Sequence, residues 1–283
     1  MVTRRAPTGT CSTNNRLQAE GGCYLKTSVV APSLRSFRAC TDRTGAPTTA
    51  RAGSSPDRSV SDLAVRAQGL SFAYVDDEYV LRDLDLGATT STLTCVTGPS
   101  GVGKTTLLYA LAGVLPAEGD VRLLGEPLPA SASARARLRL RLCGFVFQRG
   151  ELLAELTVVE NVALPLRLLG VSRIEARDRA IAALERYGIA GCADRDPMEI
   201  SSGQAQRASV ARALVHDPPI VFADEPTGSL DATSRDVVVR ALIDVARAGG
   251  CVIVATHDLA VREAADQIVD LGVTDPEAVA VLT

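Results

Sequence analysis

The sequence predicts an α/β fold built around a parallel β-sheet. Two short, unbroken apolar runs, at residues 220–223 and 251–255, have the composition of central strands that are buried on both faces. A third segment, at residues 93–97, runs directly into a glycine-rich turn that is followed by a helical pattern. Strands that alternate with helices are typical of α/β domains with a parallel sheet.

The other elements follow in order along the chain. Alternating apolar residues predict early strands at 63–74, and further patterns predict a helix at 105–114 and a short strand and turn at 120–128. Arg and Leu alternate over residues 131–142, which would also fit a strand. We expect a helix there, because Ala and Arg are good helix formers and Gly144 follows. Helical periodicity over residues 151–195 predicts further helices.

The composition argues against several classes of protein. The chain has 283 residues, of which 46% are hydrophobic, so it can bury the core of one large or two small domains. It contains no run of 18 apolar residues, and we therefore expect no membrane span. The formal net charge of -3 argues against nucleic acid as a partner.

Residues 1–61 differ in composition from the remainder. They are basic and rich in Arg, Ser, Thr, Pro and Gly without periodicity, which predicts a disordered N-terminal extension. The alternative is that translation starts at a later residue. We expect the folded domain to span residues 62–283.

Residues 98–105 read GPSGVGKT and match the pattern G-x-x-x-x-G-K-[ST] in full, between a strand and a helix. Glycines allow backbone N–H groups to surround phosphate oxygens, and the helix N-terminus adds partial positive charge. Lys104 is the only lysine after Lys26, and we expect it to reach the β- and γ-phosphates. The Thr105 hydroxyl would be a ligand of Mg²⁺.

Asp224 and Glu225 follow the apolar run at 220–223. A carboxylate at the carboxyl end of a parallel strand lies at the edge where α/β proteins bind ligands. We expect Asp224 to hold Mg²⁺ through water and Glu225 to act as the general base for an attacking water.

A second small-residue turn, Ser201, Ser202, Gly203 and Gln204, precedes another helical pattern. It predicts a second anion site at a helix N-terminus. One chain has no evident use for two γ-phosphate sites on one nucleotide. A head-to-tail dimer, in which each subunit contributes one site to its partner's nucleotide, would use both.

With these motifs in this order, residues 62–283 resemble the ATP-binding subunits of ABC transporters. Residues 200–204 read ISSGQ, where that family usually has LSGGQ. The resemblance implies a P-loop NTPase (RecA-like) core with an antiparallel β subdomain and an α-helical subdomain at about residues 149–215. It also implies ATP and Mg²⁺ as cofactors and the hydrolysis of ATP to ADP and phosphate.

The resemblance also implies roles for single residues. Tyr74 matches the aromatic residue that stacks on adenine, and Gln148 the glutamine that contacts Mg²⁺ and the attacking water and senses the membrane partner. His257 matches the residue that contacts the γ-phosphate, and Asp231 lies in a loop that crosses the dimer interface. The implied catalytic residues are Lys104, Gln148, Glu225 and His257, and the metal ligands are Thr105, Gln148 and Asp224. The implied nucleotide-binding residues are Tyr74, Gly98, Pro99, Ser100, Gly101, Val102, Gly103, Lys104, Thr105, Thr106, Ser201, Ser202, Gly203, Gln204 and Asp231.

Ser202 is a departure from the family pattern, because it replaces the first glycine of the signature pair. In the family the γ-phosphate contacts come mainly from the serine and the second glycine, and Ser201 and Gly203 retain both. We therefore expect a tuned site. The alternative is a cassette silenced by Ser202 that acts as a structural partner.

Residues 151–166 (ELLAELTVVENVALPL) resemble the subfamily of lipoprotein-release, macrolide-export and cell-division ATPases. That resemblance implies a homodimer that powers a separate permease, docked near residues 148–156, for export or for force transmission to the envelope. It places the chain on the cytoplasmic face of the plasma membrane, in contact with the membrane only through the permease. A non-transport regulatory ATPase and a soluble ABC ATPase remain alternatives.

Overall fold

The parallel sheet of the computed structural model has five strands in the order β6-β7-β8-β3-β9. The structure describes residues 63–75, 78–148, 150–228 and 230–272. The strands are β3 (Thr92–Thr97), β6 (Cys143–Val146), β7 (Ile220–Asp224), β8 (Cys251–Ala255) and β9 (Gln267–Asp270). The three strands expected from apolar runs are confirmed as β3, β7 and β8. The edge strands β6 and β9 were not expected, because four residues give too little periodicity.

The register of the sheet brings the ends of three strands together. Asp224 of β7 is paired with Ala255 of β8, and Ala255 is paired in turn with Val96 of β3. Both pairings are parallel, so the segments that follow these three strands leave from the same edge of the sheet. The turn at 98–105, the Asp224–Glu225 pair and His257 therefore start from one edge.

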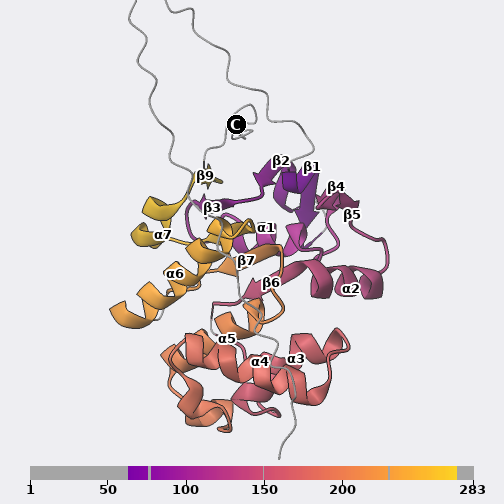
Figure 1. The fold of residues 1–283 in the computed structure, drawn as a ribbon. Helices are drawn as coiled ribbons and strands as arrows, with labels where there is room; N and C mark the ends of the chain where they lie inside the picture. The colour runs from indigo at the N-terminus through magenta and orange to yellow at the C-terminus, as the bar shows by residue number, and fades with distance from the viewer. Residues whose placement is uncertain (1–62, 76–77, 149, 229, 273–283) are drawn as a thin grey trace, which may run out of the picture. The chain divides into compact units, whose positions relative to one another are not determined.

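Successive side chains of the central strands alternate between two hydrophobic cores. Phe222 and Ile253 belong to the core that includes α1 (Lys104–Leu111) and the antiparallel sheet. Val221 and Val254 belong to the core that includes α6 (Ala232–Arg247) and the helices between β6 and β7. Burial on both faces explains why these strands are continuously apolar. In Figure 1, α6 and α7 (Leu259–Ala264) lie next to each other.

A second, antiparallel sheet has the strand order β2-β1-β4-β5. Its strands are β1 (Leu63–Ala73), β2 (Tyr79–Thr89), β4 (Glu118–Leu123) and β5 (Glu126–Pro127). The antiparallel sheet that the family resemblance implied is thus present. The strand β2 was not among the expected elements, because polar residues interrupt its alternation.

Three helices lie between β6 and β7: α3 (Val158–Leu168), α4 (Arg173–Arg186) and α5 (Ser202–Leu214), and Figure 1 shows them grouped together. Each begins at a side-chain cap, formed by Thr157, Ser172 and Ser201. Short 3₁₀ turns at Ala190–Cys192 and Pro197–Glu199 connect α4 to α5.

The helix expected over residues 131–142 is confirmed as α2 (Ala132–Leu142). The helix expected to reach Val114 is shorter, since α1 ends at Leu111 and Gly113, with φ 64°, follows it in the left-handed conformation that ends helices. Among the described helices, none is both long and apolar enough to cross a membrane. The extension expected over residues 1–61 lies outside the described residues.

Candidate active site

A cleft of about 570 Å³ opens at the carboxyl edge of the parallel sheet, where β3, β7 and β8 end. Its walls come from the antiparallel sheet, the glycine-rich turn, and the segments after β6, β7 and β8. The described residues that line it are Tyr74, Val80, Ser100, Gly101, Gly103, Lys104, Thr105, Thr106, Gln148, Asp224, Glu225, Gly228 and His257. The structure thus gathers most of the predicted site residues in one place.

The turn at residues 98–105 leads directly into α1. Gly103 is the N-cap of α1 with φ 105°, a conformation that side chains rarely adopt, and a Cβ added there would lie 2.8 Å from Cγ1 of Val80. No side chain caps this helix. The N–H groups of its first turn therefore remain available to an anion.

Lys104 is almost fully buried, with an exposed fraction of 8%. Its ammonium donates to the carbonyl oxygens of Gly98 at 2.9 Å and Pro99 at 3.1 Å, and lies 3.0 Å from Nε2 of His257. A lysine ammonium only donates, so Nε2 of His257 is the acceptor in this contact. Carbonyl groups of the turn thus hold the positively charged ammonium of Lys104 close to the N-terminus of α1. Pro99 also accepts from the N–H of Val102, at 3.3 Å, which closes the turn.

Asp224 ends β7 and is buried. Burial raises the pKa of its carboxyl group, while a hydrogen bond from the Thr105 side chain and the charge of Lys104 act in the opposite direction. A buried carboxylate beside a hydroxyl offers the hard oxygen atoms that Mg²⁺ prefers. The described residues contain no group of three or more His, Cys, Asp or Glu side chains suited to a metal. A divalent cation at Asp224 would therefore need phosphate or water oxygens as well.

Glu225 follows Asp224 with φ 41°, in the left-handed region that is uncommon for residues other than glycine. Its Oε2 accepts a hydrogen bond of 3.0 Å from the hydroxyl of Thr256 and one of 3.4 Å from the N–H of His257. Its Oε1 lies 3.7 Å from Nε2 of His257. One carboxylate oxygen is thus fixed by the protein, and the other faces the His257 ring.

Thr256 is a site residue that the sequence analysis missed. It is 1% exposed, and it also accepts a hydrogen bond of 3.1 Å from the N–H of Asp258. The sequence contained one signal for Thr256: it is a polar residue between an apolar strand and the predicted site residue His257.

Tyr74 also lines the cleft and lies directly after β1. Its hydroxyl is 3.1 Å from that of Thr106, and its ring meets Phe72 edge-on with centroids 4.9 Å apart. The side chain is nevertheless 62% exposed. These contacts hold the ring in position while leaving most of its surface open.

The second predicted anion site does not line this cleft. None of the described residues Ser201, Ser202, Gly203 and Gln204 is among those that form its walls. Ser201 caps α5: its hydroxyl accepts from the N–H of Gln204 at 3.2 Å, and Gln204 Oε1 accepts from the N–H of Ser201 at 2.9 Å. The N–H groups of Ser202 and Gly203, in the first turn, have no carbonyl partner within the helix.

Asp231 also lies outside the walls of the cleft and caps α6. Its carboxylate accepts from the N–H of Ser234 at 2.9 Å and from the Ser234 hydroxyl at 2.8 Å, which lowers the pKa of Asp231. Arg207 of α5 bonds to the same Ser234 hydroxyl. The N-terminal parts of α5 and α6 are therefore linked through Ser234.

A glycine-rich turn that holds a buried lysine, beside a strand that ends in a buried Asp and is followed by a Glu, defines a P-loop nucleoside triphosphatase. Residues 81–228 match the family described as ABC transporter. The chain belongs to that family.

Two relatives with assigned names illustrate the relationship. The chain is 41% identical over 196 residues to the lipoprotein-releasing system ATP-binding protein LolD of Hyphomonas neptunium, a match that covers 68% of this chain and 86% of that protein. It is 43% identical over 194 residues to the macrolide export ATP-binding/permease protein MacB of Rhodopseudomonas palustris, again over 68% of this chain. That match covers 30% of the MacB protein.

A solved structure points to the same family as the sequence relatives. The dimeric ATP-binding cassette MJ0796 in a post-hydrolysis state, bound to ADP and Pi, has a TM-score of 0.70 and 31% identity. The match covers 74% of this chain and 94% of that one. The present chain is an ABC-type ATPase that binds ATP.

Proposed function

We propose that the chain is the ATP-hydrolysing subunit of an ABC transporter and drives a separate membrane permease through closure and opening of a head-to-tail homodimer. The permease would serve export or force transmission to the envelope, with the ATPase peripheral on the cytoplasmic face of the plasma membrane. The observation that carries the proposal concerns two of the described helix N-termini, those of α1 and α5. Both are suited to anions, but of these two the N-terminus of α1 opens into the cleft and that of α5 does not.

The geometry of α5 supports the head-to-tail arrangement. Ser201 and Ser202 are exposed, and the capping box uses the N–H groups of Ser201 and Gln204. The N–H groups of Ser202 and Gly203 remain for a phosphate that the chain's own cleft does not supply. A second copy, turned so that its cleft faces α5, would supply it, and the two clefts would then be closed in the same way. The solved cassette MJ0796 described above is dimeric.

Within each cleft, Lys104 and the N–H groups of α1 would bind the β- and γ-phosphates, and Tyr74 would contact adenine. The residues fit Mg²⁺: Thr105, Asp224 and the amide oxygen of Gln148 would hold it, Asp224 through water. When bound, the ion neutralises charge on the phosphate oxygens.

Hydrolysis would depend on the placement of Glu225 and His257. Thr256 holds Oε2 of Glu225 at 3.0 Å, so the carboxylate can accept a proton from water without losing its orientation. His257 would hydrogen-bond the γ-phosphate. Most of the rate acceleration would come from such positioning and from the fixed positive charges.

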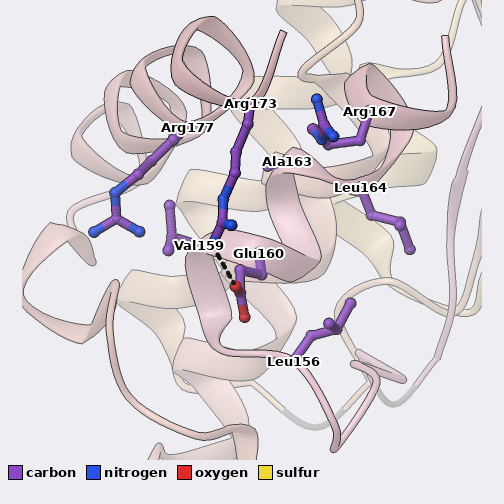
Figure 2. Close-up of a pocket in the computed structure, with 8 residues that line it drawn as sticks. All are labelled: Leu156, Val159, Glu160, Ala163, Leu164, Arg167, Arg173 and Arg177. Carbon is purple, nitrogen blue, oxygen red and sulfur yellow. Dashed lines mark ion pairs between the residues drawn. The ribbon is translucent and has the colours of Figure 1, made fainter. Parts of the chain in front are cut away.

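The permease would dock near residues 148–156. Leu156, at the end of this segment, lines a pocket of about 250 Å³ between α3 and α4, which Figure 2 shows in close-up. Its other lining residues are Val159, Glu160, Ala163, Leu164, Arg167, Arg173 and Arg177. An apolar floor with three guanidinium groups and one carboxylate fits an amphipathic cytoplasmic segment of the permease that carries acidic residues.

The dimer can be tested with Ser202→Asp in the Glu225→Gln background. A carboxylate at the first position of α5 suits the helix dipole, so the fold should persist, but it would repel the partner's γ-phosphate. We expect ATP to bind with unchanged affinity while the ATP-induced doubling of mass, measured by light scattering, disappears. Ser202→Asn, neutral and of the same size, is the control and should still dimerise. A dimer that forms equally well with Ser202→Asp would contradict the head-to-tail arrangement.

The permease can be tested by purification from solubilised membranes. Leu164→Glu places a charge on the apolar floor of the pocket, and we expect it to lose a membrane protein that co-purifies with the wild type. Ile174→Glu, an exposed position on α4 outside the pocket lining, is the control. Equal recovery of the same permease with both variants would contradict docking at this pocket.

A further inference from the structure

The segments that carry Gln148 and Glu225 are both bonded to one buried side chain on α5. Gln206 is 2% exposed, and its Nε2 donates to the carbonyl oxygen of Phe147 at 2.9 Å and to that of Pro226 at 3.1 Å. Phe147 immediately precedes Gln148, and Pro226 immediately follows Glu225. A single amide nitrogen thus spans the backbone of two catalytic segments that are far apart in sequence.

The amide suits this role because it has two donors on one nitrogen. A buried carbonyl without a hydrogen-bond donor is unfavourable. Both backbone segments are therefore most stable when their carbonyls stay within hydrogen-bond distance of Nε2 of Gln206. The Oε1 atom of Gln206 has no hydrogen-bond partner among the described residues. Among the described residues, the buried amide of Gln206 thus forms hydrogen bonds through its NH₂ group and none through its oxygen.

Two further contacts attach the segment after Gln148 to α5. Gly150 has φ 74° and packs so closely that a Cβ there would lie 3.0 Å from the carbonyl carbon and oxygen of Ala205. Arg212, two turns further along α5, donates to the carbonyl oxygens of Glu151 at 2.9 Å and Gly150 at 3.4 Å. The segment around Gln148 is therefore bonded to α5 through Phe147, Gly150 and Glu151, and Gln206 also bonds α5 to Pro226, next to Glu225.

We propose that Gln206 is a positioning residue, which ties Gln148 and Glu225 of one chain to the helix that begins with the same chain's Ser201–Gln204 turn. In the proposed dimer, on which this inference rests, that turn binds the partner's nucleotide. Movement of α5 when it engages the partner would then move both catalytic groups of its own chain. Gln206 does not line the cleft, so it would act on turnover and metal use rather than on ATP affinity.

The test replaces Gln206 with Met, which is unbranched, similar in length and has no donor. We expect kcat to fall by about tenfold or more, because misplacement of catalytic groups by about 1 Å can cost up to about 100-fold. The dissociation constant for ATP should stay within about threefold, and the Mg²⁺ concentration for half-maximal activity should rise, since Gln148 is displaced. All rates are normalised to nucleotide-binding sites, which removes any effect of partial unfolding.

Two further variants make the result specific. Gln206→Asn keeps the donor nitrogen but is one methylene too short to reach both carbonyls. Its kcat should lie between those of the wild type and Gln206→Met, and it replaces Gln206→Met in the test if that variant does not fold. Ser209→Ala, at a buried position of α5 whose hydroxyl has no partner among the described residues, is the matched control. It should match the wild type in kcat and in Mg²⁺ dependence.

The outcomes separate this inference from the proposed function. The positioning role alone would be overturned if Gln206→Met had the wild-type kcat. It would also be overturned if total activity fell only as much as the number of nucleotide-binding sites and the Mg²⁺ requirement stayed unchanged. A wild-type protein that does not hydrolyse ATP would contradict the proposed function, and this inference with it.

Discussion

The ammonium nitrogen of Lys104 and Nε2 of His257 lie 3.0 Å apart, although 153 positions separate the two residues in the sequence. Together with the carbonyls of Gly98 and Pro99, His257 completes the set of acceptors around this ammonium. A nucleotide phosphate would compete for the same protons. Binding of ATP would therefore exchange contacts of Lys104 within the protein for contacts with phosphate and release His257 to face the nucleotide.

A first prediction concerns the shape of the cation at position 104. Lys104→Arg keeps the charge but replaces a compact ammonium with a planar guanidinium, which does not fit among two turn carbonyls and a histidine ring. We expect the affinity for ATP to fall by about tenfold or more, measured by calorimetry. The exposed Arg240→Lys is the reverse exchange on α6 and should have no effect. Wild-type affinity in Lys104→Arg would show that the ammonium geometry is unimportant.

A second prediction concerns Glu225, the proposed general base. Glu225→Gln keeps the size and the acceptor for Thr256 but cannot take a proton from water. We expect ATP to bind while phosphate release slows by about 10²- to 10⁴-fold, and we expect dimers to accumulate with ATP. Glu185→Gln, at an exposed position on α4, is the control. Full turnover in Glu225→Gln would refute the assignment.

A third prediction links Asp224 to stability and pH. Burial raises the pKa of this carboxyl group in the folded state, so its ionised form opposes folding at neutral pH. Asp224→Asn should therefore raise Tm in the absence of nucleotide and Mg²⁺, by about 2–4 °C for each kcal/mol gained, and abolish hydrolysis.

The size of this effect should depend on pH. The stability of the wild type is reduced above the folded-state pKa of Asp224 and recovers as pH falls through that value towards the unfolded-state pKa of about 4. The Tm advantage of Asp224→Asn should shrink over the same range, as followed by calorimetric scans at several pH values. A variant less stable than wild type at neutral pH would contradict the prediction.

A fourth prediction concerns the proposed contact of Tyr74 with adenine. Base stacking on an aromatic ring is worth roughly 1–3 kcal/mol, so Tyr74→Ala should weaken ATP binding by about 5- to 150-fold. Tyr74→Phe keeps the ring and loses only the hydroxyl contact with Thr106, so its affinity should stay close to that of the wild type. Equal losses in both variants would assign the effect to the hydroxyl instead of the ring.

The sequence was informative where the chemistry depends on neighbouring residues. The turn at 98–105 and the Asp224–Glu225 pair are contiguous, and each follows an apolar run long enough to predict a strand. The order of strands and helices then predicted the α/β class and the sheet edge that bears the cleft. The disordered extension expected over residues 1–61 remains a prediction, because these residues lie outside the described ones.

Only the tertiary structure decided which distant groups meet. The edge strands β6 and β9 are defined by their hydrogen-bonded neighbours, because four residues of their own carry too weak a pattern. The bonds from Gln206 to the carbonyls of Phe147 and Pro226 join residues 59 and 20 positions apart, and backbone acceptors have no signature in the sequence. Local periodicity and contiguous motifs determine which residues can form a strand, a cap or an anion site. The packing of those elements determines which donor reaches which acceptor, and here it brought Lys104, Glu225 and His257 to one cleft and left Ser201–Gln204 outside it.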